Sequence, residues 1–200
     1  MALSVSLKRV FIFIIILIGL IIAVPLIAAL FVDNDFSVER QIVIDKPSDE
    51  VFEYVRMLRN QDEYSKWATM DPNMTNSYTG EDGTVGFISA WEGNDDVGKG
   101  EQEIVRIEEG KRIDTKLRFI EPFESQADAY MITESISENQ TRVTWGFDSS
   151  MPYPMNLMLL VVDFNEAIGE DYQYGLDKLK AIIESMEPED GEATTDTETT

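Results

Sequence analysis

The stretch that decides the fold is FSVERQIVIDKPSDEVFEYV, residues 36–55. Its first ten residues are rich in β-branched side chains and partly alternate between apolar and polar, which is typical of a β-strand. Lys46-Pro47-Ser48 then ends the strand. Ser48 is expected to cap a helix, because a serine side-chain oxygen can accept a hydrogen bond from a backbone N–H of the first turn. Asp49 and Glu50 in that turn suit the positive end of the helix dipole. That helix should pack an apolar face against a core, through Val51, Phe52, Val55 and Leu58.

The residues after this helix predict a sheet and a closing helix. A second short helix is expected over 60–67, and six further strands over 74–149, where turn signals recur between β-rich runs. Apolar residues alternate most clearly in 112–119 and 142–148. One long amphipathic helix should then cover the apolar face of the sheet. Its apolar positions are Leu160, Phe164, Ile168, Leu176, Leu179, Ile183 and Met186.

Several segments of this α+β pattern carry a family resemblance. They are residues 36–55, WATMDPNM (67–74), VGFISAWEGNDDVGKG (85–100), LRFIEPF (117–123), TRVTWGF (141–147), MPYPMNLM (151–158) and GEDYQYGLDKLKAIIES (169–185). In order and spacing they resemble the polyketide cyclase/dehydrase-like branch of the SRPBCC superfamily, which also includes START domains and the birch pollen allergen family. The resemblance spans residues 36–186. It implies a helix-grip fold, in which a curved antiparallel sheet of about seven strands wraps around a long C-terminal helix and leaves an apolar cavity between them.

Large apolar side chains are candidates to line that cavity. Leu117, Phe119, Trp145 and Phe147 share the inward face on the alternation above, and the others come from an earlier strand, the rim and the long helix. For each residue the alternative is a core role without ligand contact, as is usual for aromatic stripes. Taken together, they are consistent with a pocket for a hydrophobic ligand. The predicted set is Trp67, Phe87, Trp91, Leu117, Phe119, Trp145, Phe147, Phe164 and Ile168.

The run VFIFIIILIGLIIAVPLIAALFV, residues 10–32, is uncharged and predicts a membrane-spanning helix. Such a helix reaches about 35 Å, enough for a hydrocarbon core of about 30 Å. A cleaved signal peptide is the disfavoured alternative, because the apolar part of a signal peptide is usually about 7–15 residues long. Lys8 and Arg9 precede the run, which favours a single-pass protein of the cell membrane with its folded domain outside the cytoplasm.

The chain is thereby divided into four parts. A short flank (1–9) and the anchor (10–32) precede the helix-grip domain (34–186), and EPEDGEATTDTETT (187–200) follows it. This last segment is acidic and has no large apolar side chain, so we expect it to be disordered.

Composition excludes several functions. The 200 residues contain 16 Lys plus Arg against 38 Asp plus Glu, a net charge of −22, which argues against binding nucleic acid. The chain has no Cys and no His, so it lacks thiolate zinc sites, thiol nucleophiles and the usual neutral-pH proton shuttle. We therefore expect no metal, no cofactor and no catalytic residue. Acid/base chemistry would need a carboxylate or phenol buried with a shifted pKa, for which the candidates are Glu101, Glu103, Asp128 and Tyr130.

A second apolar run, residues 157–162, is too short to span a bilayer. It is either a buried helix or an apolar lip at a pocket mouth that touches membrane or admits a lipid. The favoured function is a membrane-anchored domain that binds a lipid or other hydrophobic small molecule in an internal cavity. Two alternatives stay open: a cyclase- or aromatase-like enzyme acting on a hydrophobic substrate, and a non-enzymatic protein-interaction module whose cavity its own side chains fill.

Overall fold

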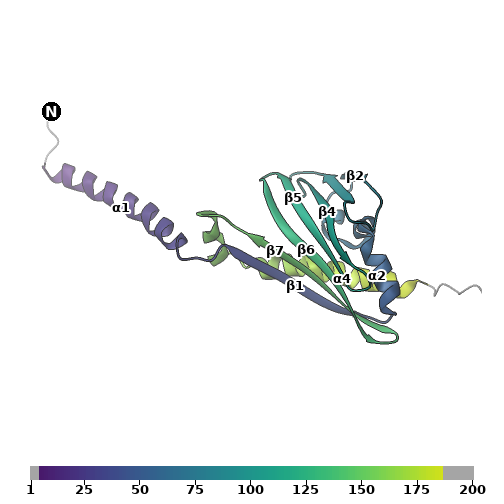
Figure 1. Cartoon of the computed structure of the whole chain (residues 1–200). Coiled ribbons are helices and arrows are strands. Elements are labelled where there is room, and N and C mark those ends of the chain that lie inside the picture. The colour runs from purple at the N-terminus through teal and green to yellow at the C-terminus, as the bar shows by residue number, and fades with distance from the viewer. Residues whose placement is uncertain (1–4, 187–200) are drawn as a thin grey trace, which may run out of the picture.

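A computed structural model describes residues 5–186 of the chain. A long N-terminal helix, α1 (Val5–Ala29), projects from a domain in which a curved sheet lies against a C-terminal helix, α4 (Phe164–Ser185) (Figure 1). The acidic segment 187–200, which we expect to be disordered, lies outside the described residues, as do residues 1–4.

Seven strands form one antiparallel sheet. They are β1 (Asp35–Ile44), β2 (Thr75–Thr79), β3 (Ile88–Glu92), β4 (Lys99–Glu108), β5 (Arg112–Glu121), β6 (Ser125–Ser137) and β7 (Gln140–Ser150). Their order is β1-β7-β6-β5-β4-β3-β2, so the first strand pairs with the last. Asp35 lies opposite Ser150, which brings the chain leaving α1 beside the chain entering the C-terminal segment. The predicted α+β fold of about seven strands is confirmed.

The helical segment after β1 differs in detail from the expectation. Helix α2 (Ser48–Arg56) begins at Ser48 itself, with Pro47 before it and no side-chain cap, so the predicted Ser48 cap is wrong. Proline suits this position because its fixed φ directs the chain into the helix and it has no N–H to leave unpaired. The second short helix is split into η1 (Leu58–Asn60), α3 (Gln61–Tyr64) and η2 (Trp67–Thr69).

The long C-terminal helix starts later than its apolar spacing indicates. Asp163 ends the preceding segment and accepts a hydrogen bond from the backbone N–H of Glu166 at 3.0 Å, so α4 begins at Phe164. Leu160 belongs instead to a short 3-10 helix, η3 (Met155–Leu160), and is 65% exposed. The interpretation of 157–162 as a buried helix is therefore wrong. At the other end, Met186 lies just beyond α4 and is also exposed.

One core joins the sheet to α2 and α4. The apolar positions of α2 are buried as predicted, and so are three of those on α4, namely Leu176, Leu179 and Ile183. The removal of each such side chain from water stabilises the fold by about 1.5–3 kcal/mol. The strands contribute Ile44, Ile104, Ile113, Met131, Val143, Trp145 and Phe147 to the same core.

Candidate functional site

The inner face of the sheet carries most of the predicted site residues. Leu117 and Phe119 of β5 lie beside Ala127 and Ser125 of β6, and Phe147 of β7 lies opposite Ala129. The small side chains of β6 leave room between the larger ones of its two neighbours. The sheet therefore presents its bulky apolar groups in two rows, on β5 and on β7.

Trp145 is the centre of the first aromatic group. It is 5% exposed and stacks on Tyr172 of α4, with ring centroids 4.4 Å apart and planes 16° apart. Tyr64 meets Trp145 edge-on at 5.7 Å, and Trp67 meets Tyr172 edge-on at 5.7 Å. Trp67 and Trp145 are thus brought together through a tyrosine that sequence analysis did not select.

Phe147 and Phe164 form a second group through Phe36 of β1. The Phe36 ring centroid lies 6.0 Å from that of Phe147 and 5.3 Å from that of Phe164. Ile168 lies one turn further along α4 and is half-buried against the core. This group lies where β1, β7 and the start of α4 meet.

Trp91 and Phe119 form a third group on the far strands, meeting edge-on at 6.0 Å. Gly100 makes this possible, because a Cβ there would lie 2.5 Å from the Trp91 ring. Phe87 stands apart from all three groups: it is fully buried and stacks on Tyr78 at 6.2 Å. The nine predicted residues therefore do not border one common space, and their role as ligand contacts stays a prediction.

The hollow enclosed beneath the sheet measures about 10 Å³, room for about one water molecule. It lies between the strands and the segment from α2 to α3, and Gln61, Gln102, Thr115 and Trp145 are among its lining residues. Gln102 donates a hydrogen bond through Nε2 to the Thr115 hydroxyl at 2.9 Å. A lipid would fit here only if side chains moved.

Two buried phenols lie beside this core. The Tyr64 side chain is fully buried, and its hydroxyl has no hydrogen-bond partner among the described residues. Burial raises the pKa of Tyr64 and of Tyr172 far above the ordinary phenol value. Both side chains are therefore neutral at physiological pH and place uncharged hydroxyl groups within the core.

The four acid/base candidates direct their polar groups to the outer face of the sheet, and of the four only Tyr130 is also among the residues that line the hollow. Glu101 and Glu103 are both paired with Arg118, and Asp128 is paired with Lys116 at 2.8 Å. The Tyr130 hydroxyl donates to Glu39 at 2.9 Å, and burial together with this bond raises the pKa of Tyr130 to about 12.

These pairs make a charged outer surface, so none of the four polar groups faces the interior. Metal chemistry finds no support either, since residues 5–186 contain no cluster of three His, Cys, Asp or Glu side chains that could hold an ion.

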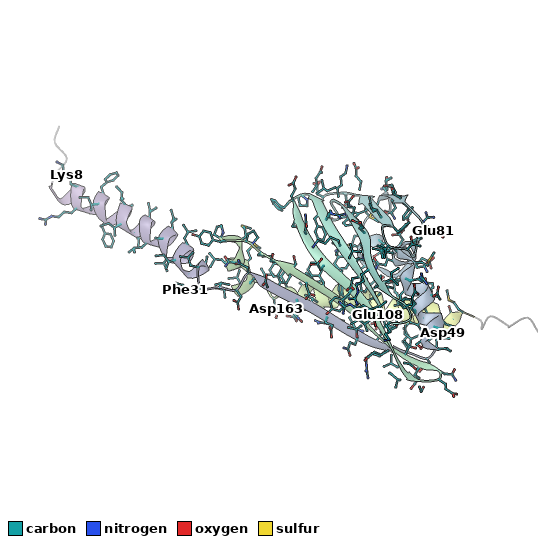
Figure 2. The ribbon with its side chains drawn as sticks, viewed as in Figure 1. Lys8, Phe31, Asp49, Glu81, Glu108 and Asp163 are labelled. Carbon is teal, nitrogen blue, oxygen red and sulfur yellow. The ribbon has the colours of Figure 1, made fainter. Side chains whose placement is uncertain are left out.

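A far larger hollow lies at the end of the domain next to α1. This groove measures about 750 Å³ and is formed by the chain that leaves α1 and by the segment that joins η3 to α4. Figure 2 places Phe31 and Asp163 at this end of the domain, with Asp49, Glu81 and Glu108 at the other. The lining residues of this groove are Phe31, Val32, Asp33, Asp35, Phe36, Ser37, Leu159, Leu160, Val161, Val162, Asp163, Phe164 and Asn165.

Asn156 of η3 fixes the shape of the groove by binding the end of α1. Its side-chain Nδ2 lies 2.8 Å from the carbonyl oxygen of Ala29, 3.0 Å from that of Val32 and 2.9 Å from the Asn34 side-chain oxygen. Asn156 and Ala29 are 1% and 2% exposed. The last turn of a helix leaves carbonyl groups without intrahelical partners, and Asn156 supplies one. The two walls of the groove are thus held together by buried hydrogen bonds.

Comparison with known proteins agrees with this architecture. Residues 35–184 match the model of the family described as "Polyketide cyclase / dehydrase and lipid transport". The chain belongs to this family. The resemblance seen in its sequence segments is therefore confirmed, and the family relationship supports a domain that binds hydrophobic ligands. A comparison with the curated proteins finds no match.

Solved structures of the same fold are distant in sequence. Protein CV1439 from Chromobacterium violaceum is 13% identical, with a TM-score of 0.53 over 75% of this chain and 98% of its own. Truncated norcoclaurine synthase from Thalictrum flavum is 6% identical, with a TM-score of 0.58 over 78% and 98%. Major latex-like protein 151 from Panax ginseng is 15% identical, with a TM-score of 0.54 over 74% and 97%. At these identities the likeness shows the helix-grip fold alone.

Several features of this SRPBCC domain were missed by sequence reasoning. Tyr172 and Phe36 lie on faces that apolar spacing could have assigned, since Tyr172 is four residues after Ile168 and Phe36 is two residues before Val38, which lies opposite Phe147. Gln102 was missed because a polar residue at an inward position gives no apolar signal. Asn156 was missed because a buried Asn that binds the end of another helix leaves no pattern in the sequence.

Proposed function

We propose that this chain is a membrane-anchored domain that binds a lipid or another hydrophobic small molecule at the end of the domain next to α1. The proposal rests on the groove formed by residues 31–37 and 159–165, which we name the juxtamembrane groove because the proposed anchor places it beside the membrane. Its volume of about 750 Å³ falls in the range of ligand pockets, about 300–1,000 Å³, and apolar side chains of Phe31, Phe36, Leu159 and Val162 contribute to its wall. The family relationship supports the same chemistry.

The anchoring half of the proposal rests on α1. Its segment Lys8–Ala29 has 22 residues with a mean hydropathy of 3.4, and the window that sets this value is not buried against the domain. Such a helix is about 33 Å long, enough to cross a hydrocarbon core of about 30 Å. Lys8 and Arg9 favour an N-terminus inside the cell and a domain outside the cytoplasm.

The contacts of Asn156 favour an anchor over a cleaved signal sequence. Cleavage after the small residues Ala28 and Ala29 would remove the Ala29 carbonyl that Asn156 binds and free the linker that forms one wall of the groove. Asn156 would keep two of its three acceptors, the Val32 carbonyl and the Asn34 side chain, but would lose the fully buried one, and a lost buried hydrogen bond costs about 1–3 kcal/mol. This cost supports an N-terminal helix that stays attached to the domain.

Aromatic rings connect the juxtamembrane groove to the inner face of the sheet. Phe36 and Phe164 line the groove and contact each other, and Phe36 also contacts Phe147. Trp145 is the next residue on the same face of β7, about 7 Å further along the strand. We propose that a bound acyl chain or ring system displaces the phenylalanine rings and reaches Trp145.

A second candidate function has one observation in its favour. The hollow beneath the sheet holds only about one water, as expected of a protein-interaction module whose interior is filled by its own side chains. The two functions differ in whether a hydrophobic molecule can reach the core. The enzymatic alternative has no such support, because the polar groups of its four candidate side chains face outward.

Quenching of Trp145 distinguishes the two candidates. Replacing Trp67 and Trp91 by Phe leaves Trp145 as the single tryptophan, which is excited at wavelengths that tyrosine does not absorb, and at 5% exposure it is shielded from the detergent around α1. We expect a brominated fatty acid to quench Trp145 in the full-length chain with a saturable dependence on concentration, because bromine quenches on contact.

The same fatty acid without bromine is the control and should leave the emission intensity unchanged. If the brominated compound has no more effect on Trp145 than the control, the ligand does not reach the core, and the protein-interaction module is favoured instead.

A further inference from the structure

An exposed apolar surface surrounds the point where α1 joins the domain. Phe31 is 84% exposed and Leu30 68%, and on η3 and the turn after it Leu160 is 65% and Val161 81% exposed. Met155 and Met158 of η3 are exposed at 54% and 39%. We name these six residues the apolar platform. Large apolar side chains gathered at one place on a soluble domain mark a contact surface.

The platform is also free of charge in a strongly acidic protein. Residues 151–162, MPYPMNLMLLVV, contain no Asp, Glu, Lys or Arg, although the whole chain carries a net charge of −22. A segment that faced water throughout would have no reason to lose its charges locally. An uncharged segment can instead enter the headgroup region of a bilayer without the cost of desolvating ions.

The position of the platform relative to α1 is fixed by buried hydrogen bonds. Asn156 is the second residue of η3 and binds the carbonyl groups of Ala29 and Val32, so η3 starts at the level where the apolar helix ends. The segment Lys8–Ala29 has 22 residues, of which the first two are basic, and is only slightly longer than the hydrocarbon core. Side chains held beside its last turn therefore lie at the boundary between acyl chains and headgroups.

We propose that the apolar platform inserts into the outer leaflet of the bilayer that α1 spans. This inference rests on the proposed anchoring by α1 and adds an orientation to it. The domain is held against the membrane on one side of the helix axis, and the juxtamembrane groove opens at the lipid surface. Because Leu160 and Val161 belong to both the platform and the groove wall, a lipid can pass between bilayer and groove without crossing water.

Single cysteines test the proposal cleanly, because the chain has no native Cys. Leu160→Cys reports on the platform, Ile22→Cys on α1 and Ile136→Cys on the far hairpin between β6 and β7; these side chains are 65%, 57% and 45% exposed. Each full-length variant is labelled with an environment-sensitive nitrobenzoxadiazole dye and placed in phosphatidylcholine nanodiscs. Lipids with a nitroxide near the headgroup or deep in the acyl chain then quench the dye according to its depth.

We expect blue-shifted emission quenched by the shallow nitroxide at position 160, quenching by the deep nitroxide at 22, and neither effect at 136. Val161→Cys should repeat the result for position 160. If position 22 is quenched but 160 and 161 behave like 136, the platform proposal is overturned while the anchoring stands.

If position 22 itself reports water, the anchoring fails, and the proposed function fails with it. Blue-shifted emission at 160 without quenching by either lipid would mean that protein covers the platform, such as a second copy of the chain, and would also overturn the proposal.

Discussion

Replacing Trp145 by alanine is expected to lower the free energy of unfolding of the domain by about 3–5 kcal/mol. Trp145 is 5% exposed, stacks on Tyr172 at 4.4 Å and meets Tyr64 edge-on, so its removal leaves a cavity at the point where β7, α3 and α4 meet. Gly175 of α4 is shaped to the same ring, since a Cβ there would lie 2.8 Å from it. Denaturant unfolding of the full-length chain in detergent, followed by circular dichroism of the sheet, measures the loss.

Trp91→Ala is the matched control for this experiment. Trp91 is half-buried on an outer strand and contacts Phe119 near the rim of the inner face, so its neighbours and solvent can close over the space it leaves. We expect a clearly smaller loss than for Trp145. Equal losses for the two variants would contradict the assignment of Trp145 to the centre of the core.

Asn156→Leu is expected to release the domain from the end of α1. The substitution removes the side-chain donor to the carbonyl groups of Ala29 and Val32 and leaves the Ala29 carbonyl with only the long bond from the Val32 N–H at 3.4 Å, at a cost of about 1–3 kcal/mol. A change of this size raises the population of the open junction by about fivefold to about 150-fold. Hydrogen exchange of residues 29–37 should accelerate by the same factor, while exchange in β5 and β6 stays unchanged.

The control for this prediction is Asn73→Leu, at an exposed Asn outside the junction. It should leave exchange at residues 29–37 unchanged. If Asn156→Leu behaves like this control, the hydrogen bonds of Asn156 do not hold the junction, and the fixed position of the apolar platform loses its basis.

Strand periodicity was sufficient to predict the sheet and much of its inner face. Leu117, Phe119, Trp145 and Phe147 all face inward, because a sheet that buries one face forces alternate residues to that side. Alternation was a weaker guide to the inward-facing residues of β4, where the register shifts between Ile104 and Arg106. An extra residue at such a bulge breaks the period of two, so the core position that follows Ile104 is Ile107 and not Arg106.

Helix boundaries and pocket sizes were harder to predict, for different reasons. Leu160 continues the apolar spacing of α4, but Asp163 caps the helix three residues later, so local capping overrides periodicity. The size of the inner hollow depends on how the side chains of Tyr64, Tyr172 and Trp145 pack, which no sequence pattern specifies. The groove depends on one buried Asn and on the path of a linker. The sequence therefore predicted the strands and helices that enclose the interior better than the sizes of the cavities between them.

Native mass spectrometry of the full-length chain released from lipid nanodiscs tests the central claim most directly. The proposed function predicts one co-purifying hydrophobic molecule per chain, and predicts that Val162→Trp, which fills the juxtamembrane groove, reduces its occupancy. Val105→Trp is the matched control, since Val162 and Val105 are 36% and 44% exposed and only Val162 lines the groove. A wild-type chain that carries no such molecule, or an occupancy that both substitutions leave unchanged, would contradict ligand binding at this end of the domain.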